Sequence, residues 1–286
     1  MTLRQLRDIY VNRLETLYPE QEAISIFKII CEDLLQMDKS DIMIRGEEPL
    51  LHLREKLLLR SLETLITGKP VQQITGIAHF YGHEFKVNEH TLIPRQETEE
   101  LVQWILDDHK NTTVNSILDI GTGSGCIGIS LGHAFAKANS SKSKLQVTLM
   151  DISTDALQLA QSNAECIAHE VSFKAKEQDI LKAKELETYD VIVSNPPYVR
   201  ELEKTELHTN VLDHEPASAL FVSDTDPLVF YRKILELTAG HVKPVVYFEI
   251  NQYLPEKMKS LATDLGFKSE IRKDLNGNHR MMKCWK

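Results

Sequence analysis

The sequence predicts an α/β protein in which a doubly wound, mostly parallel sheet of seven strands follows a small N-terminal helical bundle. Two observations carry this prediction. Up to about residue 70, apolar residues recur at the spacing of amphipathic helices. From residue 95 onward, short apolar runs alternate with helical segments, which is typical of βαβ units that place parallel strands in one sheet.

The first 70 residues are expected to form a helical domain. One apolar stripe runs from Leu3 to Leu17, Pro19 interrupts it, and a second runs from Ile24 to Leu35. A third extends from Leu50 to Ile66 and stops at Gly68. Such stripes usually form the core of a bundle, and a cofactor-binding role is the alternative. A bundle beside a catalytic domain commonly positions a macromolecular partner.

Residues 71–94 carry short β-type runs with glycines at 76 and 82, which predicts a β-hairpin linker. A larger domain is expected over residues 95–286. Its seven strands are predicted at 116–120, 145–150, 171–174, 190–194, 245–250, 267–272 and 280–285. Its helices are predicted at 99–108, 127–138, 154–167 and 227–237, with one more ending near residue 265. Ligands of such sheets bind beyond the carboxyl ends of the strands.

Composition favours an intracellular globular enzyme. The 286 residues are 42% hydrophobic and 26% charged, which argues against wholesale disorder. No apolar stretch approaches a membrane span, and charges interrupt the first residues where a signal peptide would be apolar, so the expected location is the cytoplasm. The formal net charge of −9 argues against a nucleic-acid substrate without excluding one, because an acidic protein can still carry a basic groove.

Cysteines and histidines predict no metal site. The cysteines are dispersed and are expected to be reduced, small hydrophobic side chains; they are Cys31, Cys126, Cys166 and Cys284. His79 and His83 stand four residues apart, but the surrounding sequence predicts a hairpin, where this spacing does not converge on one helical face.

Asn195-Pro196-Pro197-Tyr198 follows the apolar run 191–194, which is typical of a buried strand. Proline lacks an N–H group and fixes φ, so the two prolines hold the backbone rigid and leave carbonyl oxygens free. The Asn195 side chain and these carbonyls can accept both hydrogens of a planar NH2 group. A turn that merely ends the strand is the alternative. The segment alone leaves amide and nucleobase substrates equally open.

A glycine-rich loop follows the first strand of the sheet. Its glycines would let a ligand approach the backbone, and the next helix would present free N–H groups. The candidate ligand-binding residues of this loop are Gly121, Thr122, Gly123, Ser124 and Gly125. Asp119 precedes the loop. This residue could brace the loop or contact a ligand, and the sequence favours neither role over the other.

Acidic residues follow the next two strands. Asp151 ends the second strand, where a carboxylate could accept hydrogen bonds from both hydroxyls of a ribose. Asp179 follows the third and could meet an adenine amino group, with Ile180 packed on the ring. Helix capping is the alternative for both. Residues 123–128 also fit the G-x-G-x-x-G pattern of NAD-dependent oxidoreductases, but the glycines begin two positions earlier and residues 195–198 have no role in hydride transfer.

Together these motifs resemble the HemK/PrmC-type glutamine N5-methyltransferases that modify class I peptide release factors. The most specific segments are 73–76, 92–99, 119–125, 195–198, 215–220, and 274–277 with Arg280. The resemblance implies a class I, Rossmann-like methyltransferase fold, S-adenosyl-L-methionine as cofactor and class I release factors as partners. The methyl acceptor would be the glutamine of their Gly-Gly-Gln motif, and residues 1–70 would recognise this substrate.

Besides the less favoured NAD-dependent oxidoreductase, two further functions stay open. The segment N-P-P-Y also occurs in adenine and guanine amino methyltransferases, so a nucleic-acid methyltransferase is the main alternative. Residues 94–99 and the helical domain favour the protein-glutamine branch. The other possible function is that of a regulator that binds the cofactor without catalysing a reaction.

The resemblance also implies roles for individual residues. Asn195 and Pro196 would hold the substrate NH2 group and Tyr198 would pack near it, which makes these three catalytic. The substrate would contact Asn195, Pro196, Pro197 and Tyr198. The cofactor would contact 121–125, Asp151, Asp179, Ile180 and Asn195. Arg95, Glu97 and Thr98 would close over the cofactor, and an ordinary helix start is the alternative. For Glu215 a structural role is open, in which it orders the loop after Tyr198. The chain departs from the family pattern at Gln96, at 223–227 and at 241–244.

Overall fold

The structure is a computed structural model that describes residues 1–138, 145–206, 209–242 and 244–286. Residue 243, within the segment 241–244 where the chain departs from the family pattern, lies outside these residues. The described residues form two compact units. Residues 1–77 and 209–214 make up the N-terminal unit, and residues 78–206 and 215–286 make up the larger one.

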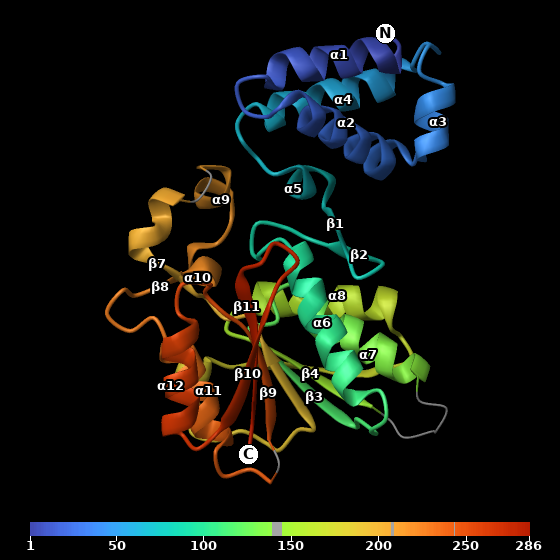
Figure 1. The fold of residues 1–286 in the computed structure, drawn as a ribbon. Coiled ribbons are helices and arrows are strands. Elements are labelled where there is room, and N and C mark those ends of the chain that lie inside the picture. Colours follow the sequence, from blue (N-terminus) through green and yellow to red (C-terminus); the bar gives the residue numbers. More distant parts are fainter. Residues whose placement is uncertain (139–144, 207–208, 243) are drawn as a thin grey trace. The chain divides into compact units, whose positions relative to one another are not determined.

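The N-terminal unit is helical (Figure 1). Its helices are α1 (Leu3–Leu14), α2 (Glu20–Leu35), α3 (Lys39–Ile44), α4 (His52–Leu65), α5 (Val71–Thr75) and α9 (Thr209–His214). Thr2 caps α1, because its hydroxyl accepts from the Gln5 N–H group and the Gln5 side chain accepts from the Thr2 N–H group. The Tyr10 and Phe27 rings meet edge to face at 5.0 Å in the core of the bundle. The predicted apolar stripes therefore pack against one another.

The hairpin is shorter than the sequence predicts. Residues 71–75 form α5 instead of a β-type run, and Gly76 ends this helix with a φ of 76°. The strands β1 (Ile77–Phe80) and β2 (His83–Lys86) follow and pair with each other. The Phe80 and Phe85 rings lie in the core of the larger unit.

The larger unit contains the predicted seven-stranded sheet. Its strands are β3 (Ser116–Ile120), β4 (Gln146–Asp151), β5 (Ser172–Glu177), β6 (Val191–Ser194), β9 (Val245–Glu249), β10 (Lys268–Lys273) and β11 (His279–Trp285). The order is β10-β11-β9-β6-β3-β4-β5. The five strands from β9 to β5 run parallel, and β11 pairs antiparallel with both β9 and β10. The predicted mostly parallel, doubly wound sheet is confirmed.

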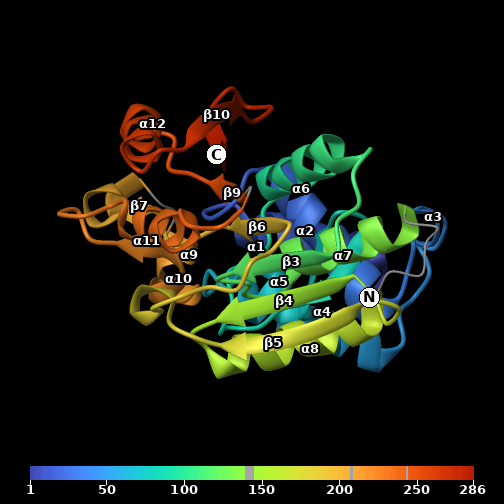
Figure 2. The ribbon, with the colours of Figure 1, turned by 90° about the horizontal axis from the view of Figure 1, so that it is seen from below.

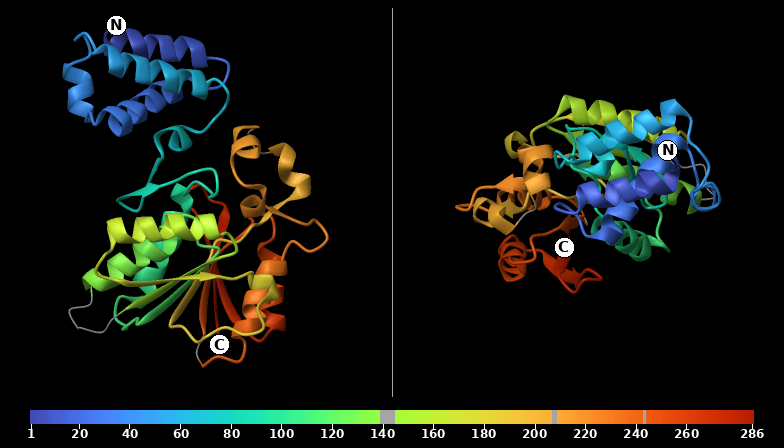
Figure 3. Two further views of the ribbon diagram at one scale, coloured as in Figure 1. Left: turned by 180° about the vertical axis from the view of Figure 1, so that it is seen from behind. Right: turned by 90° about the horizontal axis from the view of Figure 1, so that it is seen from above.

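Helices cover both faces of this sheet (Figure 2). One face carries α6 (Gln96–His109), α7 (Cys126–Ala138) and α8 (Thr154–Ile167), and the other carries α11 (Val229–Thr238) and α12 (Pro255–Asp264). Successive residues of one strand alternate between the two cores: Ile117 belongs to the first and Leu118 to the second. The left-hand view of Figure 3 shows the same three layers from behind.

The connection from β6 to α11 contains short elements that the sequence did not predict. They are β7 (Val199–Arg200), the 3-10 helix η2 (Glu201–Glu206), α10 (Ala217–Leu220) and β8 (Phe221–Val222), with α9 between them. The strands β7 and β8 pair in parallel as a separate two-residue ladder. This insertion follows Tyr198 directly, so it extends from the carboxyl end of the central strand β6, where the candidate site lies.

The described part of the chain contains no helix that is long and apolar enough to cross a membrane. Within the same residues, no group of three or more His, Cys, Asp or Glu side chains is arranged to hold a metal ion. All four cysteines are free thiols.

Candidate active site

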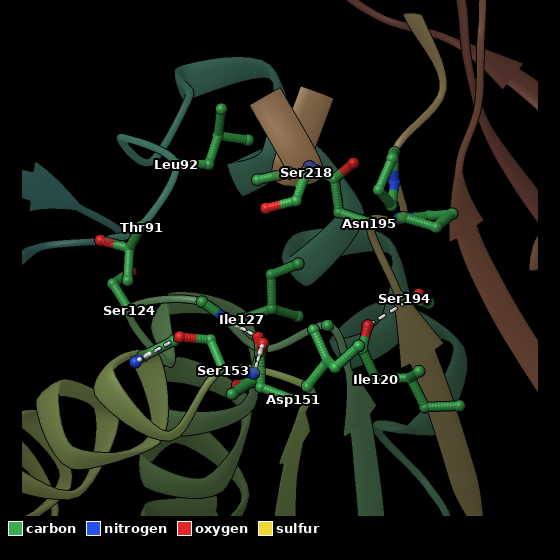
Figure 4. A pocket seen from close by; sticks show the side chains of 18 of the residues that line it. Thr91, Leu92, Ile120, Ser124, Ile127, Asp151, Ser153, Ser194, Asn195 and Ser218 are labelled. Carbon is green, nitrogen blue, oxygen red and sulfur yellow. Dashed lines mark hydrogen bonds between the residues drawn. The ribbon is translucent and has the colours of Figure 1, made fainter. Parts of the chain in front are cut away.

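A pocket of about 330 Å³ opens at the carboxyl ends of β3, β4, β5 and β6. Its lining comes from residues 90–95, the glycine loop, the residues after β4 and β5, Asn195–Pro197, and the helices α10 and α11. In Figure 4, Asn195 lies on one wall, Thr91 on another and Asp151 below them. A parallel sheet binds its ligands at this edge, so the fold itself marks the pocket as the candidate site.

The glycine loop forms the floor of the pocket. Gly121 and Thr122 donate their N–H groups to the Met150 carbonyl at 2.8 and 3.0 Å, which ties the loop to the end of β4. Gly121 and Gly123 have φ values of 70° and 54°, in the left-handed region that favours glycine. Of the five residues predicted in this loop, Gly121, Thr122, Gly123 and Ser124 line the pocket.

Gly125 does not line the pocket. A Cβ atom at this position would lie 2.5 Å from Ile129 Cδ1 and 3.2 Å from Ala160 Cβ, and the φ of Gly125 is 84°. The missing side chain therefore lets the start of α7 pack closely against α8. The structure thus gives this glycine a packing role, and its predicted ligand contact stays a prediction.

Asp119 braces the glycine loop from below. It is buried and absent from the pocket lining. Its Oδ2 atom accepts hydrogen bonds from the Thr122 hydroxyl at 2.7 Å and from the Gly128 N–H group at 2.9 Å. Of the two roles left open by the sequence, the structure supports bracing. Burial raises the pKa of Asp119 to about 6, although both hydrogen bonds oppose this rise.

The raised pKa of Asp119 predicts a pH dependence of stability. The folded pKa lies above the ordinary value of 3.8, so the folded state holds this proton in a range where the unfolded chain releases it. Stability from this group is therefore lost as the pH rises from about 4 to about 6 and stays low above that. We expect the free energy of unfolding of the wild type, relative to Asp119→Asn, to increase by about 1 kcal/mol between pH 7 and pH 5. Denaturant unfolding at the two pH values measures this difference, and a constant difference would contradict the prediction.

Asp151 and Asp179 both line the pocket and also cap local structure. Asp151 accepts hydrogen bonds from the N–H groups of Gly123 and Ser153, each at 2.9 Å, with one oxygen for each. Asp179 accepts from the Leu181 N–H group at 3.0 Å at the start of the 3-10 helix η1 (Ile180–Lys182). The second oxygen of Asp179 also pairs with the exposed Lys182 ammonium at 3.0 Å. Because a carboxylate oxygen can accept two hydrogen bonds, both groups can still accept from a ligand.

Asn195, Pro196 and Pro197 line the wall of the pocket next to β6. The strand end before them is fixed, because the Ser194 hydroxyl donates to the Ile120 carbonyl at 2.7 Å. Among the described residues, neither the Asn195 side chain nor the carbonyls of Asn195 and Pro196 take part in a hydrogen bond. The predicted set of free acceptors is therefore present at the pocket.

Tyr198 turns away from the pocket lining. Its hydroxyl donates to Glu249 Oε1 at 2.9 Å, and Arg280 Nη1 lies 3.4 Å from the same hydroxyl. Its carbonyl accepts from the Asn251 side chain at 2.9 Å. Burial and the neighbouring carboxylate raise the pKa of Tyr198 far above its ordinary value. The structure thus gives Tyr198 a place behind the Asn195 segment, whereas the sequence predicted one beside the substrate.

Three buried polar atoms of the pocket lining have no hydrogen-bond partner within the described residues. They are Thr91 Oγ1, Ser124 Oγ and Gln178 Oε1. Buried polar groups are normally paired, so these atoms indicate where a polar ligand would bind. Thr91 and Gln178 were missed by the sequence reasoning, because no local pattern distinguishes them from ordinary polar loop residues.

Glu215 joins two segments of the pocket wall. Its carboxylate is 1% exposed and accepts from the Arg95 guanidinium at 2.5 Å and from the Ile93 N–H group at 3.2 Å. Residues 93–95 and 218–219 both contribute to the lining. Thr98 also lines the pocket, whereas Glu97 does not. Of the residues predicted to close over a cofactor, Arg95 and Thr98 are therefore in place to do so.

Two family profiles match the chain. The profile described as "PrmC N-terminal domain" matches residues 5–76, and the one described as "Methyltransferase small domain" matches residues 97–234. Among solved structures, the hMettl16 catalytic domain in complex with a MAT2A 3'UTR hairpin is similar, with a TM-score of 0.55 and 14% identity over 80% of this chain and 81% of that one. This likeness shows the fold and nothing more.

Curated relatives match nearly the whole chain. A release factor glutamine methyltransferase from Flavobacterium psychrophilum is 43% identical over 99% of both chains. One from Bacteroides thetaiotaomicron is 40% identical over 94% of this chain and 95% of its own, and one from Bacillus subtilis is 37% identical over 85% of each. A methyltransferase domain implies the use of S-adenosylmethionine, and neither the nucleic-acid enzyme nor the oxidoreductase is favoured. The chain belongs to the release factor glutamine methyltransferase family.

Proposed function

We propose that this protein transfers a methyl group from S-adenosyl-L-methionine to the side-chain amide of the glutamine in the Gly-Gly-Gln motif of class I peptide release factors. The observation that supports it most is the pair of free acceptors at the pocket, the Asn195 side-chain oxygen and the Pro196 carbonyl. A primary amide offers two N–H hydrogens, and two fixed acceptors match them. The names of the curated relatives agree with this substrate.

The pocket is suited to the methyl donor. Its volume of about 330 Å³ lies within the range of about 300–1,000 Å³ that small-molecule sites occupy. Asp151 would accept the ribose hydroxyls, Asp179 the adenine amino group, and Ile180 would pack on the ring. Gly121–Ser124 would contact the donor through the backbone, and Thr91 and Gln178 offer unpaired polar atoms. When bound, S-adenosylmethionine would supply an electrophilic methyl group: the S–CH3 bond breaks as the N–CH3 bond forms, and the demethylated product is a neutral thioether. The amide nitrogen loses one proton in the same reaction, so a proton acceptor is required and a general acid is not.

Asn195 and Pro196 prepare the amide nitrogen for attack. The nitrogen of an amide is a poor nucleophile because its lone pair is delocalised into the carbonyl group. Hydrogen bonds from its NH2 group to the Asn195 side chain and the Pro196 carbonyl would orient the lone pair and favour a more pyramidal nitrogen. Because two prolines restrict this backbone, the acceptors are held in place before the substrate arrives, and such positioning supplies much of the acceleration.

The proposal also assigns a role to each of three segments of the chain. Residues 1–70 form the substrate-recognition domain, 71–94 the linker and 95–286 the catalytic domain. The match of residues 5–76 to the profile described as "PrmC N-terminal domain" supports the first assignment. The acidic net charge of −9 supports a protein substrate over a nucleic acid, whose phosphates would be repelled.

Incubation with labelled S-adenosylmethionine tests the function. The acceptors are a release factor with an intact Gly-Gly-Gln motif, the same factor with the glutamine replaced by alanine, and DNA and RNA. We expect label on the intact factor alone. Label confined to nucleic acid would instead indicate an amino methyltransferase, and binding of the donor without transfer to any acceptor would indicate a regulator.

A further inference from the structure

Glu249 holds a position that neither the motifs nor the cofactor pocket explains. It is the last residue of β9, it is buried at 2% exposure, and β9 lies between β6 and β11 in the sheet. Both of its carboxylate oxygens accept hydrogen bonds, Oε2 from the Thr98 hydroxyl at 2.6 Å and Oε1 from the Tyr198 hydroxyl at 2.9 Å. A carboxylate costs free energy to bury, so a position that needed only packing would be better served by an apolar side chain.

The two hydroxyl groups come from two segments that are far apart in the sequence. Thr98 lies on α6 and lines the pocket. Tyr198 follows the two prolines and ends the segment that presents the free acceptors. We propose that Glu249 is a positioning residue for methyl transfer: by accepting one hydrogen bond from Thr98 and one from Tyr198, it fixes the Asn195–Tyr198 segment to the wall of the pocket. This inference rests on the proposed function.

Charged side chains surround the hydrogen bond between Tyr198 and Glu249. Arg280 Nη1 lies 3.4 Å from the Tyr198 hydroxyl, and Arg280 Nε lies 3.3 Å from Asp274 Oδ2. Burial raises the pKa of Glu249, whereas the hydrogen bonds from Thr98 and Tyr198 and the positive charge of Arg280 oppose this rise. The main chain of Glu249 is held as well, since its carbonyl accepts from the Tyr231 hydroxyl at 3.1 Å.

The acceptor segment is thereby anchored at both ends. Ser194 fixes its start through the bond to the Ile120 carbonyl, and Tyr198 fixes its end through Glu249 and Asn251. Asn195 and the two prolines span the interval between these anchors. Loosening the second anchor would let Asn195 and the Pro196 carbonyl move relative to the pocket, which affects the reacting geometry more than donor binding.

Tyr198→Phe tests this role, because it removes the hydroxyl of a residue that does not line the pocket. Tyr247→Phe is the matched control: Tyr247 is on the same strand and the same face as Glu249, and its hydroxyl donates at 2.8 Å to Asp108, near the end of α6 opposite to Thr98. We expect Tyr198→Phe to lower kcat about tenfold with the Kd of S-adenosylmethionine changed by less than about twofold, and Tyr247→Phe to leave kcat unchanged.

Glu249→Gln and Thr98→Val extend the test. A glutamine keeps the length of the side chain, but its NH2 group donates, so only one hydroxyl keeps an acceptor. Because Thr98 and Tyr198 act through one carboxylate, the double variant Thr98→Val/Tyr198→Phe should lose less activity than the product of the two single losses. Wild-type kcat in Tyr198→Phe, or an equal loss in Tyr247→Phe, would overturn the proposal. The proposal would also be overturned if the affinity of Tyr198→Phe for S-adenosylmethionine fell by the same factor as its kcat.

Hydrogen exchange separates this inference from the proposed function. We expect faster amide exchange in peptides covering 195–200 for Tyr198→Phe and Glu249→Gln, and unchanged exchange there for Tyr247→Phe. If the wild type transferred no label to the release factor while exchange responded in this way, the proposed function would fail and the anchor would stand. If the wild type were active and neither kcat nor exchange responded, the role of Glu249 would be refuted.

Discussion

Replacing Asn195 by alanine should lower the turnover number for methyl transfer by roughly two to three orders of magnitude, an effect comparable to the loss of one preorganised polar group in other enzymes. The variant loses the side-chain acceptor at the pocket and keeps the Pro196 carbonyl. The amide nitrogen would then be held through one hydrogen only and would sample orientations in which its lone pair points away from the methyl group. Steady-state kinetics with a Gly-Gly-Gln release factor measures the loss.

Two comparisons make the Asn195 result specific. The affinity for S-adenosylmethionine, measured by calorimetry, should change much less than the turnover number, because most of the polar lining of the pocket is intact. Asn111→Ala makes the same chemical change at an exposed position in the turn after α6 and should leave turnover unchanged. Near-normal turnover of Asn195→Ala would refute the proposed mechanism.

Where local sequence decides the structure, the elements follow the prediction closely. The helix predicted at 154–167 has these bounds in the structure, because the Ser153 hydroxyl caps its first turn by accepting from the Ala156 N–H group at 3.2 Å. The central strand β6 is short and buried at every residue, as expected for a strand covered on both faces. Its abrupt end at two prolines is also a local property.

Where distant segments decide the structure, the sequence says little. Thr98 and Glu249 are 151 residues apart, and no periodicity reveals that they meet. The direction of Tyr198 depends on this carboxylate, so the motif predicted the residue but not where its side chain points. The short helices α3 and α5 and the insertion after β6 were missed for a related reason, because elements of so few residues carry less than two turns of periodic signal.

Asp151 has two roles, because it braces the loops of the pocket floor and would also bind the ligand. Its replacement should therefore affect both. Both oxygens already accept N–H groups of the loops that form the pocket floor, from Gly123 and Ser153. A ribose would use the remaining acceptor capacity of the same carboxylate. Asp151→Ala therefore removes direct ligand contacts and also loosens the loop that approaches the ligand.

We expect Asp151→Ala to weaken the binding of S-adenosylmethionine about 100-fold, which corresponds to about 2.7 kcal/mol and to two hydrogen bonds with a charged acceptor. Calorimetric titration measures the affinity. Asp155→Ala removes an equal charge from an exposed position in the first turn of α8, outside the pocket lining, and should bind the donor normally. If Asp155→Ala lost as much affinity, the effect would be one of net charge near the site. If Asp151→Ala bound the donor normally, Asp151 would serve only to brace Gly123 and Ser153, and ribose recognition would have to come from the unpaired Thr91, Ser124 and Gln178.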